Sequence, residues 1–267
     1  MILFPPAKIN LGLKILGKRE DGYHAIESCM YAIPLTDVLE ILPSEVFEFK
    51  QTGIPVEGNE ADNLVVRAWK LLKTEYNIPN VYIHLRKVIP MGAGLGGGSA
   101  DATYTLLGLN ELFSLNLSVQ RLQELSSRLG SDCPFFVIDQ PQLAEGRGEV
   151  LSPIDVDLKG YFIKVVNPGV HIGTAEAYSN VHFSSGGEKL TEILSSAPSS
   201  WKDRLNNGFE VSAFKNHPEL KKIKDTLYNE GAIYASMTGS GSTVFGIFND
   251  LPRTTETDNF QFISRLD

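Results

Sequence analysis

Apolar and polar residues alternate along residues 7–18 of the chain. The apolar positions are Ile9, Leu11, Leu13 and Ile15. A period of two places neighbouring side chains on opposite faces of a β-strand, so this segment is predicted to be a half-buried strand. Its polar face carries Lys8 and Asn10, about 7 Å apart at a rise of about 3.3 Å per residue. One ligand could contact both, although a solvated polar face is the simpler interpretation of the pair.

Other apolar patterns divide the rest of the chain into strands and helices. Further strands are predicted at residues 25–35, 38–42, 46–50, 81–88, 161–166, 233–236 and 244–248, and helices at 62–76, 99–113, 118–129 and 220–230. Asp62 is expected to cap the first helix, and Gly130 is expected to end the third in a left-handed conformation. Trp69 is interpreted as a packing residue. The mixture predicts an α+β protein.

The pattern of apolar and polar residues changes near Ser152. Beyond it lie short apolar runs and a stretch at 184–200 that is rich in Ser, Gly and Pro. That stretch is predicted to form loops around one helix. We therefore expect one domain over residues 1–152 and a second over residues 153–267.

A turn signal, Asp21-Gly22-Tyr23-His24, separates the first two predicted strands. It places an aromatic ring and an imidazole at the exit of the turn. A histidine at the end of a hairpin is usually just exposed, so a ligand role for His24 needs support from elsewhere.

A glycine-rich loop, residues 90–102, connects a predicted strand to a predicted helix. It contains five glycines: Gly92, Gly94, Gly96, Gly97 and Gly98. Such a loop can turn its N–H groups inward, and the helix that follows adds the positive end of its dipole, so the loop is a candidate phosphate site. It lacks the lysine of a P-loop. Its G-x-G-x-x-G spacing is not followed by the second acidic strand of a dinucleotide fold, and a flexible turn that binds nothing is the remaining alternative.

Two more segments have the composition of functional loops. Asp132 stands between the end of a predicted helix and a predicted buried strand at 133–136, a position typical of catalytic groups, although its carboxylate could simply bind nearby amides. Residues 237–243, Met-Thr-Gly-Ser-Gly-Ser-Thr, form a second glycine loop.

Composition and charge argue against several classes of partner and location. The chain has 267 residues, 42% of them hydrophobic, with a net charge of −8 and a pI near 5.2, so we expect neither a nucleic-acid nor an anionic membrane partner. Cys29 and Cys133 form no metal or redox motif and are interpreted as buried thiols. No leader pattern opens the sequence and no apolar run approaches about 18 residues, so a cytoplasmic protein is expected.

Three of these segments together resemble the GHMP kinases (galacto-, homoserine, mevalonate and phosphomevalonate kinases). The matching motifs are Pro6-Ala7-Lys8-Ile9-Asn10-Leu11, the loop at residues 90–102, and the loop at 238–243. The resemblance implies a two-domain fold, with an ATP-binding catalytic domain, a smaller α+β substrate domain and an active site in the cleft between them. It also implies ATP and Mg²⁺ as cofactors and a small-molecule substrate. A monomer or weak homodimer is expected.

The motif Asp21-Gly22-Tyr23-His24 and the segments Asp132–Phe136 and Asn167–Val170 resemble one branch of this family, which phosphorylates the 2-hydroxyl of a cytidine diphosphate conjugate of methylerythritol. This resemblance implies that Tyr23 and Tyr178 stack on the cytosine while His24 bonds its edge. Tyr178 stands where the branch often has phenylalanine. The chain ends 24 residues after Thr243, which is short for the family.

The resemblance also assigns catalytic and phosphate-binding roles. Asp132 would take the proton of the acceptor hydroxyl, with Lys8 beside it and Asn10 fixing the same group. The second loop, at Gly239, Ser240 and Gly241, would bind the substrate, and the Ser99 hydroxyl could contact the magnesium that accompanies ATP. The residues implied to bind ATP are Pro90, Met91, Gly92, Ala93, Gly94, Leu95, Gly96, Gly97, Gly98, Ser99 and Ala100. The rival hypotheses are another GHMP kinase of the mevalonate or homoserine type, a non-catalytic nucleotide-binding module, and a structural α+β protein.

Overall fold

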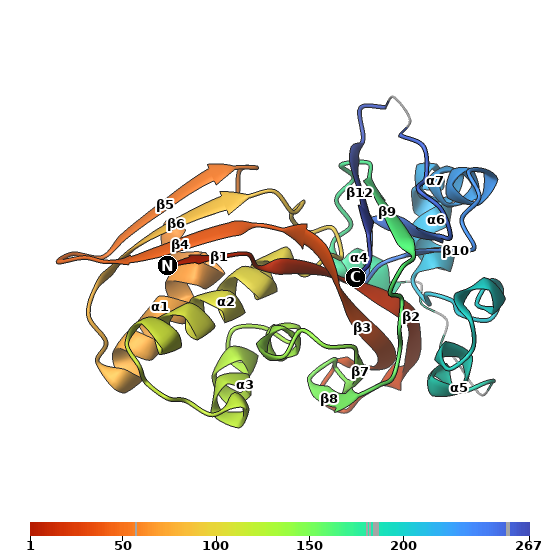
Figure 1. Ribbon diagram of the computed structural model, residues 1–267. Coiled ribbons are helices and arrows are strands. Elements are labelled where there is room, and N and C mark those ends of the chain that lie inside the picture. The colour runs from red at the N-terminus through yellow and green to blue at the C-terminus, as the bar shows by residue number, and fades with distance from the viewer. Residues whose placement is uncertain (57, 180, 182, 184–186, 255–256) are drawn as a thin grey trace. The chain divides into compact units, whose positions relative to one another are not determined.

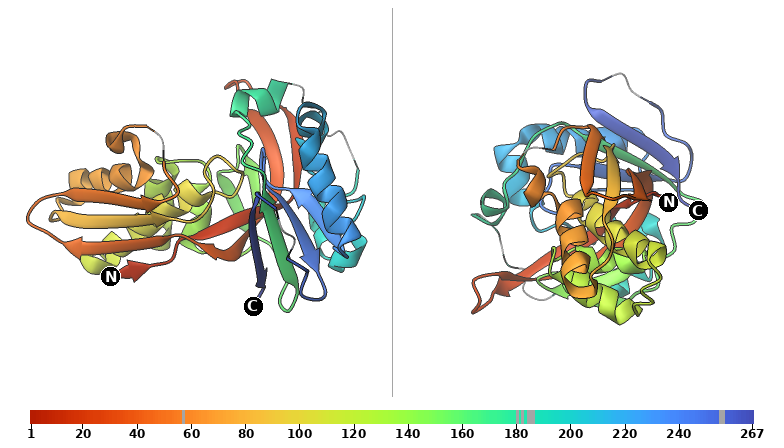
Figure 2. Two further views of the ribbon diagram at one scale, coloured as in Figure 1. Left: turned by 90° about the horizontal axis from the view of Figure 1, so that it is seen from above. Right: turned by 90° about the vertical axis from the view of Figure 1, so that its left-hand side faces the viewer.

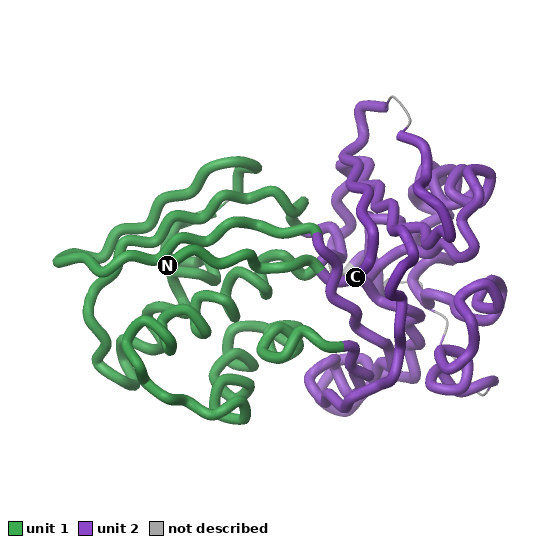
Figure 3. The backbone as a smooth tube through the Cα atoms, viewed as in Figure 1, with its two compact units in different colours: residues 1–7, 35–91, 96–140 green, residues 8–34, 92–95, 141–267 purple. Residues whose placement is uncertain are grey.

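The computed structural model describes residues 1–267 except 57, 180, 182, 184–186 and 255–256. The described chain combines helices with four-stranded sheets, which confirms the predicted α+β class (Figure 1). It divides into two compact units, each made of segments that are separate in the sequence (Figure 3). The first unit comprises residues 1–7, 35–91 and 96–140, and the second comprises 8–34, 92–95 and 141–267. The expected division near Ser152 concerns sequence domains and stays a prediction.

The first unit contains one sheet with two helices packed against it. The strand order is β1 (Ile2–Leu3), β4 (Val38–Pro43), β6 (Val81–Lys87) and β5 (Glu48–Gly53). Helices α1 (Leu64–Tyr76) and α2 (Gly97–Leu112) lie along the same face of this sheet (Figure 1). Their apolar residues form one core with those of the strands, for example Leu72, Ile83 and Leu106. Trp69 belongs to this core and stacks on Phe47 at 3.7 Å, so its predicted packing role is confirmed.

Three local predictions in the first unit are wrong, two in the position of a helix cap and one in the type of element. Asn63, not Asp62, caps α1, because its side chain accepts the Val65 N–H and the preceding residues form a short 3-10 helix, Glu60–Asp62. Helix α3 (Val119–Ser127) begins after the cap Ser118 as expected, but its C-cap is Arg128 in a right-handed conformation. The segment after Asp132 is a 3-10 helix, Cys133–Val137, and not a strand. A proline in its first turn fits a helix start better than a strand interior.

The second unit contains most of the first long hairpin. Strands β2 (Pro6–Lys18) and β3 (His24–Thr36) form a separate four-stranded sheet with β7 (Gln142–Gly146) and β8 (Val150–Pro153), in the order β2, β3, β7 and β8. The predicted half-buried character of β2 is wrong over its first half, because every residue from Ala7 to Leu13 is buried. The polar face that carries Lys8 and Asn10 is therefore covered by protein.

A second sheet completes this unit, with the antiparallel order β10 (Tyr234–Met237), β11 (Val244–Phe248), β9 (Phe162–Asn167) and β12 (Phe260–Arg265). Helix α7 (Pro218–Asn229) packs on β10 and β11, with α6 (Glu210–Asn216) beside it (Figure 2). The remaining helices are short: α4 (Thr174–Ser179), α5 (Leu190–Leu194) and a 3-10 turn, Pro198–Ser200.

Several elements have no counterpart among the predictions: β1, β7, β8, β12, α4 and α6. Each has seven residues or fewer, too few for a period to stand out. Within the described parts of the chain, every helix is too short or too polar to cross a lipid bilayer.

Candidate functional site

Lys8 and Asn10 form a hydrogen-bonded pair inside the second unit. The Lys8 Nζ atom donates to Asn10 Oδ1 at 2.6 Å and to the Gly94 carbonyl at 3.0 Å. The Asn10 Nδ2 atom donates to Ser28 Oγ at 2.8 Å, so both ends of its amide are used. Only 3% of Lys8 and 2% of Asn10 is exposed. The Lys8 ammonium is thus a buried cation that Asn10 holds in position, and this face of the strand is not solvated.

The two glycine loops meet within the same unit. The Thr238 hydroxyl accepts the Asn10 N–H at 3.0 Å and lies 3.1 Å from the Gly94 carbonyl, and the Thr243 N–H donates to the Ala93 carbonyl at 3.2 Å. Gly94 has φ = +78°, and a Cβ atom there would stand 2.1 Å from the Thr238 carbonyl oxygen. Only glycine fits this position, because the conformation is left-handed and the two backbones touch.

The glycine loop continues into helix α2, and its residues from Gly96 onward belong to the first unit. The N-cap of α2 is Gly96, which has φ = +71° and no side chain to cap the helix. The first N–H groups of a helix lack intrahelical partners, and they carry the positive end of its dipole. Helix α2 starts at Gly97, two residues before the predicted Ser99, so Ser99 lies in its first turn. This end of the helix has the N–H groups and dipole that favour an anion, and phosphate binding at the loop stays a prediction.

Asp132 lies in a loop that packs on α2 of the same unit. It is half-buried and directly precedes the 3-10 helix at Cys133. The Thr103 hydroxyl of α2 donates to the Cys133 carbonyl at 2.8 Å, which ties the Asp132 loop to the helix. A Cβ atom on Gly130 would stand 3.2 Å from Cys133 Sγ and 3.7 Å from Ser99 Oγ, so this loop reaches the first turn of α2.

The thiols take no part in this chemistry. Burial raises the pKa of Cys29 to about 12 and that of Cys133 to about 11. Both thiols stay protonated at neutral pH, and a protonated thiol is a weak nucleophile. The interpretation of both residues as buried thiols is confirmed.

A buried ionic cluster lies beneath the N-terminus of α2. Lys87 Nζ donates to a carboxylate oxygen of Asp101 at 2.8 Å and to one of Asp37, whose other oxygen accepts the Val88 and Ile89 N–H groups. Burial raises the pKa of Asp101 to about 7. Burial by itself would lower the pKa of Lys87, but the neighbouring carboxylates of Asp101 and Asp37 outweigh it and raise that pKa. A Cβ atom on Gly97 would stand 3.1 Å from Lys87 Nζ. The cluster therefore supports the start of the helix, and no sequence motif had pointed to it.

The predicted aromatic residues lie in the second unit. Tyr23 is 57% exposed at the β2–β3 turn, and the Arg147 guanidinium lies 4.9 Å from its ring centroid. His24 stacks on Tyr178 with ring centroids 4.3 Å apart, and Tyr178 meets Phe209 edge to face. A Tyr23–Tyr178 sandwich around a base stays a prediction. The stacking partner of Tyr178 in this structure is His24.

Supporting residues were missed by sequence reasoning because they belong to no glycine or catalytic motif. Ser28 holds the Asn10 amide, and Asn207 holds the carbonyls of Met237 and Gly239 at 2.8 and 2.9 Å. For Ser28, a polar residue in a short apolar segment was the available signal, whereas Asn207 stands in a polar stretch. Its partners lie far away in the sequence.

No cluster of three or more His, Cys, Asp or Glu side chains suited to a metal occurs among the described residues. Ser99 lies in the first turn of α2, and a role for its hydroxyl toward magnesium stays a prediction.

Comparison with known protein families gives matches in two regions of the chain. The sequence profile described as "GHMP kinases N terminal domain" matches residues 63–140, and that described as "GHMP kinases C terminal" matches residues 189–256. The first covers the glycine loop and Asp132. The second covers Asn207 and the loop at Thr238.

Individual relatives extend the likeness to nearly the whole chain. A protein of Azobacteroides pseudotrichonymphae named 4-diphosphocytidyl-2-C-methyl-D-erythritol kinase is 49% identical over 97% of this chain and 98% of its own length. One of Parabacteroides distasonis with the same name is 50% identical over 93% of this chain and 92% of its own.

Solved structures are also similar to this chain over nearly its whole length. The crystal structure of a 4-(cytidine 5'-diphospho)-2C-methyl-D-erythritol kinase superposes with a TM-score of 0.79 at 33% identity, covering 92% of this chain and 90% of that one. The mevalonate kinase of Methanococcus jannaschii has a TM-score of 0.66 at 17% identity, covering 100% and 98%, a likeness of fold alone.

Proposed function

Because the chain belongs to the GHMP kinase family, we propose that it transfers the terminal phosphoryl group of ATP to the 2-hydroxyl of 4-(cytidine 5'-diphospho)-2-C-methyl-D-erythritol. The observation that carries this proposal is the near full-length identity to relatives named for that substrate. The mevalonate kinase of Methanococcus jannaschii resembles the chain in fold alone, so that likeness supports neither the reaction nor the acceptor.

The glycine loop and the start of α2 fit the phosphate groups of ATP. The left-handed Gly94, the glycine N-cap Gly96 and the unpartnered first turn of α2 present backbone N–H groups and a helix dipole without side chains in the way. We assign residues 90–100 to this binding role. Mg²⁺ bound with ATP would neutralise phosphate charge, and Ser99 would share in holding it.

Lys8 supplies positive charge for the transfer step. Phosphoryl transfer spreads negative charge over the oxygens of the moving group, so a fixed cation lowers the barrier by stabilising that charge. The bond to Asn10 and the bond to the Gly94 carbonyl hold the ammonium in one place. Its burial keeps water from screening it.

Asp132 is assigned as the group that receives the proton of the acceptor hydroxyl. Its carboxylate is half-buried at the start of a 3-10 helix that is tied to α2, so its position is fixed without full loss of solvent. As the O–P bond forms, the hydroxyl proton moves to the carboxylate oxygen and the ADP oxygen leaves with the electron pair of the broken bond.

Tyr23, His24 and Tyr178 are assigned to the cytidine part of the substrate. The exposed Tyr23 ring offers a flat face, and the His24 imidazole offers one donor and one acceptor to a base edge. The second glycine loop, Gly239 to Gly241, is assigned to the substrate phosphates through its N–H groups. These residues distinguish the proposed acceptor from the small acids and alcohols that other family members phosphorylate.

A direct test is turnover with a panel of acceptors under magnesium and ATP. We expect phosphate transfer to the cytidine-linked methylerythritol, and rates at least about 100-fold lower with mevalonate, homoserine and galactose. Phosphorus NMR of the product should show a new phosphomonoester. A preference for one of the other acceptors would refute the assignment, and failure of every acceptor with intact ATP binding would favour a non-catalytic module.

A further inference from the structure

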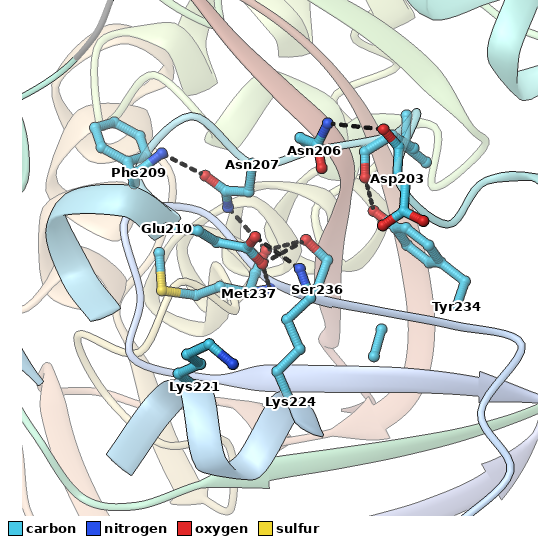
Figure 4. A network of polar contacts seen from close by, with 12 residues as sticks. Asp203, Asn206, Asn207, Phe209, Glu210, Lys221, Lys224, Tyr234, Ser236 and Met237 are labelled. Carbon is cyan, nitrogen blue, oxygen red and sulfur yellow. Dashed lines mark hydrogen bonds and ion pairs between the residues drawn. The ribbon is translucent and has the colours of Figure 1, made fainter. Parts of the chain in front are cut away.

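Asn207 has a buried side-chain amide that binds the second glycine loop, and it belongs to none of the motifs described above. It is 2% exposed and lies between Trp201 and α6. Its Nδ2 atom donates to the Met237 carbonyl at 2.8 Å and to the Gly239 carbonyl at 2.9 Å, while its Oδ1 atom accepts the Phe209 N–H at 2.9 Å (Figure 4). One side chain therefore fixes the carbonyls on both sides of Thr238.

Glu210, three residues after Asn207, binds the same end of strand β10. Its Oε1 atom accepts the Met237 N–H at 2.8 Å and the Ser236 hydroxyl at 3.1 Å, and its Oε2 atom pairs with Lys224 at 2.7 Å (Figure 4). Strand β10 is an edge strand, so its outward N–H and carbonyl groups need partners from outside the sheet. Asn207 and Glu210 provide both of them at Met237.

Thr238 connects this clamp to the catalytic lysine. Its hydroxyl accepts the Asn10 N–H and lies within hydrogen-bond distance of the Gly94 carbonyl. The same carbonyl accepts a hydrogen bond from Lys8 Nζ. A shift of Thr238 would therefore move both partners that fix the ammonium of Lys8.

The backbone beside Asn207 is also paired with β2, the strand that carries Lys8. The Leu13 N–H donates to the Asn206 carbonyl at 2.9 Å, and the Gly208 N–H donates to the Leu13 carbonyl at 2.7 Å. Asn207 therefore sits between β2 and the second glycine loop and holds one against the other.

From this geometry we propose that Asn207 is a positioning residue for phosphoryl transfer, which acts by clamping the Met237–Gly239 turn so that Thr238 and Gly94 hold Lys8 in place. This inference rests on the proposed function for its kinetic test. It goes beyond that function because the proposed function gives Asn207 no role, and Asn207 contacts only the backbone of the second glycine loop and of Phe209.

The chain supplies a matched control at the adjacent residue. Asn206 is exposed and its Nδ2 atom makes one long bond, 3.4 Å, to the Asp203 carbonyl (Figure 4). Asn207→Asp and Asn206→Asp therefore make the same chemical change in a clamped and an unclamped position. We expect Asn207→Asp to lower kcat about 30-fold or more with KM for the cytidine substrate changed less than about threefold, and Asn206→Asp to change neither.

The pH profile separates a hydrogen-bond donor from a space-filling residue. The new carboxyl would face the Met237 and Gly239 carbonyls, with the Glu210 carboxylate and the Lys224 ammonium nearby, so it should titrate above the usual range for Asp. When protonated, it can donate to one carbonyl. We expect the activity of Asn207→Asp relative to wild type to recover about threefold or more as pH falls from 8 to 6, whereas Asn207→Leu shows no recovery.

A ligand-free measurement keeps this inference separate from the proposed function. Hydrogen exchange of the full chain reports the amides of Thr238 and Thr243, which are bonded to the Thr243 and Ala93 carbonyls. We expect faster exchange over residues 237–243 in Asn207→Asp and Asn207→Leu, and no change in Asn206→Asp. This result would stand even if wild-type protein failed to phosphorylate the cytidine substrate.

Two results would overturn the inference. One is an active wild type whose Asn207→Asp variant matches Asn206→Asp in kcat and in exchange over residues 237–243. The other is an equal loss of activity in Asn207→Asp and Asn207→Leu at all pH values, which would make Asn207 a packing residue only.

Discussion

Lys8 and Asn10 lie two residues apart on strand β2, and a hydrogen bond of 2.6 Å joins the Lys8 Nζ atom to the Asn10 Oδ1 atom. The other half of the Asn10 amide is fixed by Ser28, whose hydroxyl in turn donates to the Gly12 carbonyl at 2.6 Å. The amide can therefore present only its oxygen to the lysine. This relationship makes Asn10 the first support of the proposed catalytic cation.

Asn10→Ala should slow phosphoryl transfer by roughly 100-fold, because an ammonium that moves by about 1 Å no longer meets the developing charge. The affinity for ATP should change little. Single-turnover kinetics and ATP binding by calorimetry measure the two effects. Ser28→Ala removes the support of the Asn10 amide but not its oxygen, so its rate should fall by less than that of Asn10→Ala. An unchanged rate in Asn10→Ala would contradict the orienting role of Asn10.

Asp132→Asn should lower kcat by about 100-fold or more and leave the dissociation constant for ATP unchanged, because an amide cannot accept the proton of the hydroxyl. Rapid-quench measurement of product formation gives the rate. Asp139→Asn provides a comparison in the same unit, where the carboxylate only accepts a hydrogen bond from Tyr104. Loss of ATP binding in Asp132→Asn would instead make the residue structural.

Tyr23→Ala should raise KM for the cytidine substrate about 10-fold or more with a smaller effect on kcat, since a lost stacking face removes about 1–3 kcal/mol of binding per base. Tyr23→Phe keeps the ring and the face, so its KM should stay within about twofold of wild type. Steady-state kinetics with the substrate varied decides the point. An unchanged KM in the alanine variant would rule out stacking.

Gly94→Ala should disrupt the contact between the glycine loops, because the new Cβ atom would lie 2.1 Å from the Thr238 carbonyl oxygen at φ = +78°. We expect destabilisation of about 2 kcal/mol and loss of ATP binding. Gly173→Ala is the matched control, because a Cβ atom there meets nothing within 4 Å. Urea unfolding and ATP titration of both variants test this. Similar behaviour of the pair would show that the loops are not held together at Gly94.

Asp101→Asn should change how stability depends on pH. Burial raises the pKa of Asp101 from 3.8 to about 7, so the native chain holds a proton that the unfolded chain releases above about pH 4. The free energy of unfolding therefore falls as pH rises from about 4 to about 7 and then levels off. An asparagine carries no such proton.

Urea unfolding of wild type and Asp101→Asn at pH 5 and pH 8 measures this effect. The stability of wild type relative to the variant should be greater at pH 5, by on the order of 2 kcal/mol. Titrating groups that do not interact with Asp101 cancel in this difference. A larger wild-type advantage at pH 8 would show that Asp101 is ionised and stabilised by Lys87.

Local patterns predicted the main elements of the fold correctly. The strand at Val244–Phe248 has the expected bounds, and helix α7, expected at residues 220–230, spans Pro218–Asn229. Such elements are specified by period and by turn residues, which neighbouring positions carry themselves. Some errors fell at the ends of elements, as at Asn63, where two adjacent residues could cap the same helix and only one has a side-chain oxygen placed for it. Others concerned short elements, such as the 3-10 helix at Cys133–Val137.

The candidate site was predicted to a different degree in its different parts. The glycine loops stood out because their backbone N–H groups suit phosphate, whereas the roles of Lys8 and Asp132 were implied by the resemblance to the GHMP kinases. Ser28, Asn207 and the Asp37–Lys87–Asp101 cluster did not stand out, because a buried polar residue looks the same in a sequence as an exposed one. Their roles depend on partners 14 or more residues away.

The sequence by itself determined the family, the α+β elements and the backbone freedom of the phosphate loop, since each depends on residue types at short spacing. Only the tertiary structure decided that the polar face of β2 is buried and that Lys8 is held by Asn10 and Gly94. Burying a charge or an amide is favourable only when its hydrogen bonds are satisfied, and the groups that satisfy them are brought together by folding.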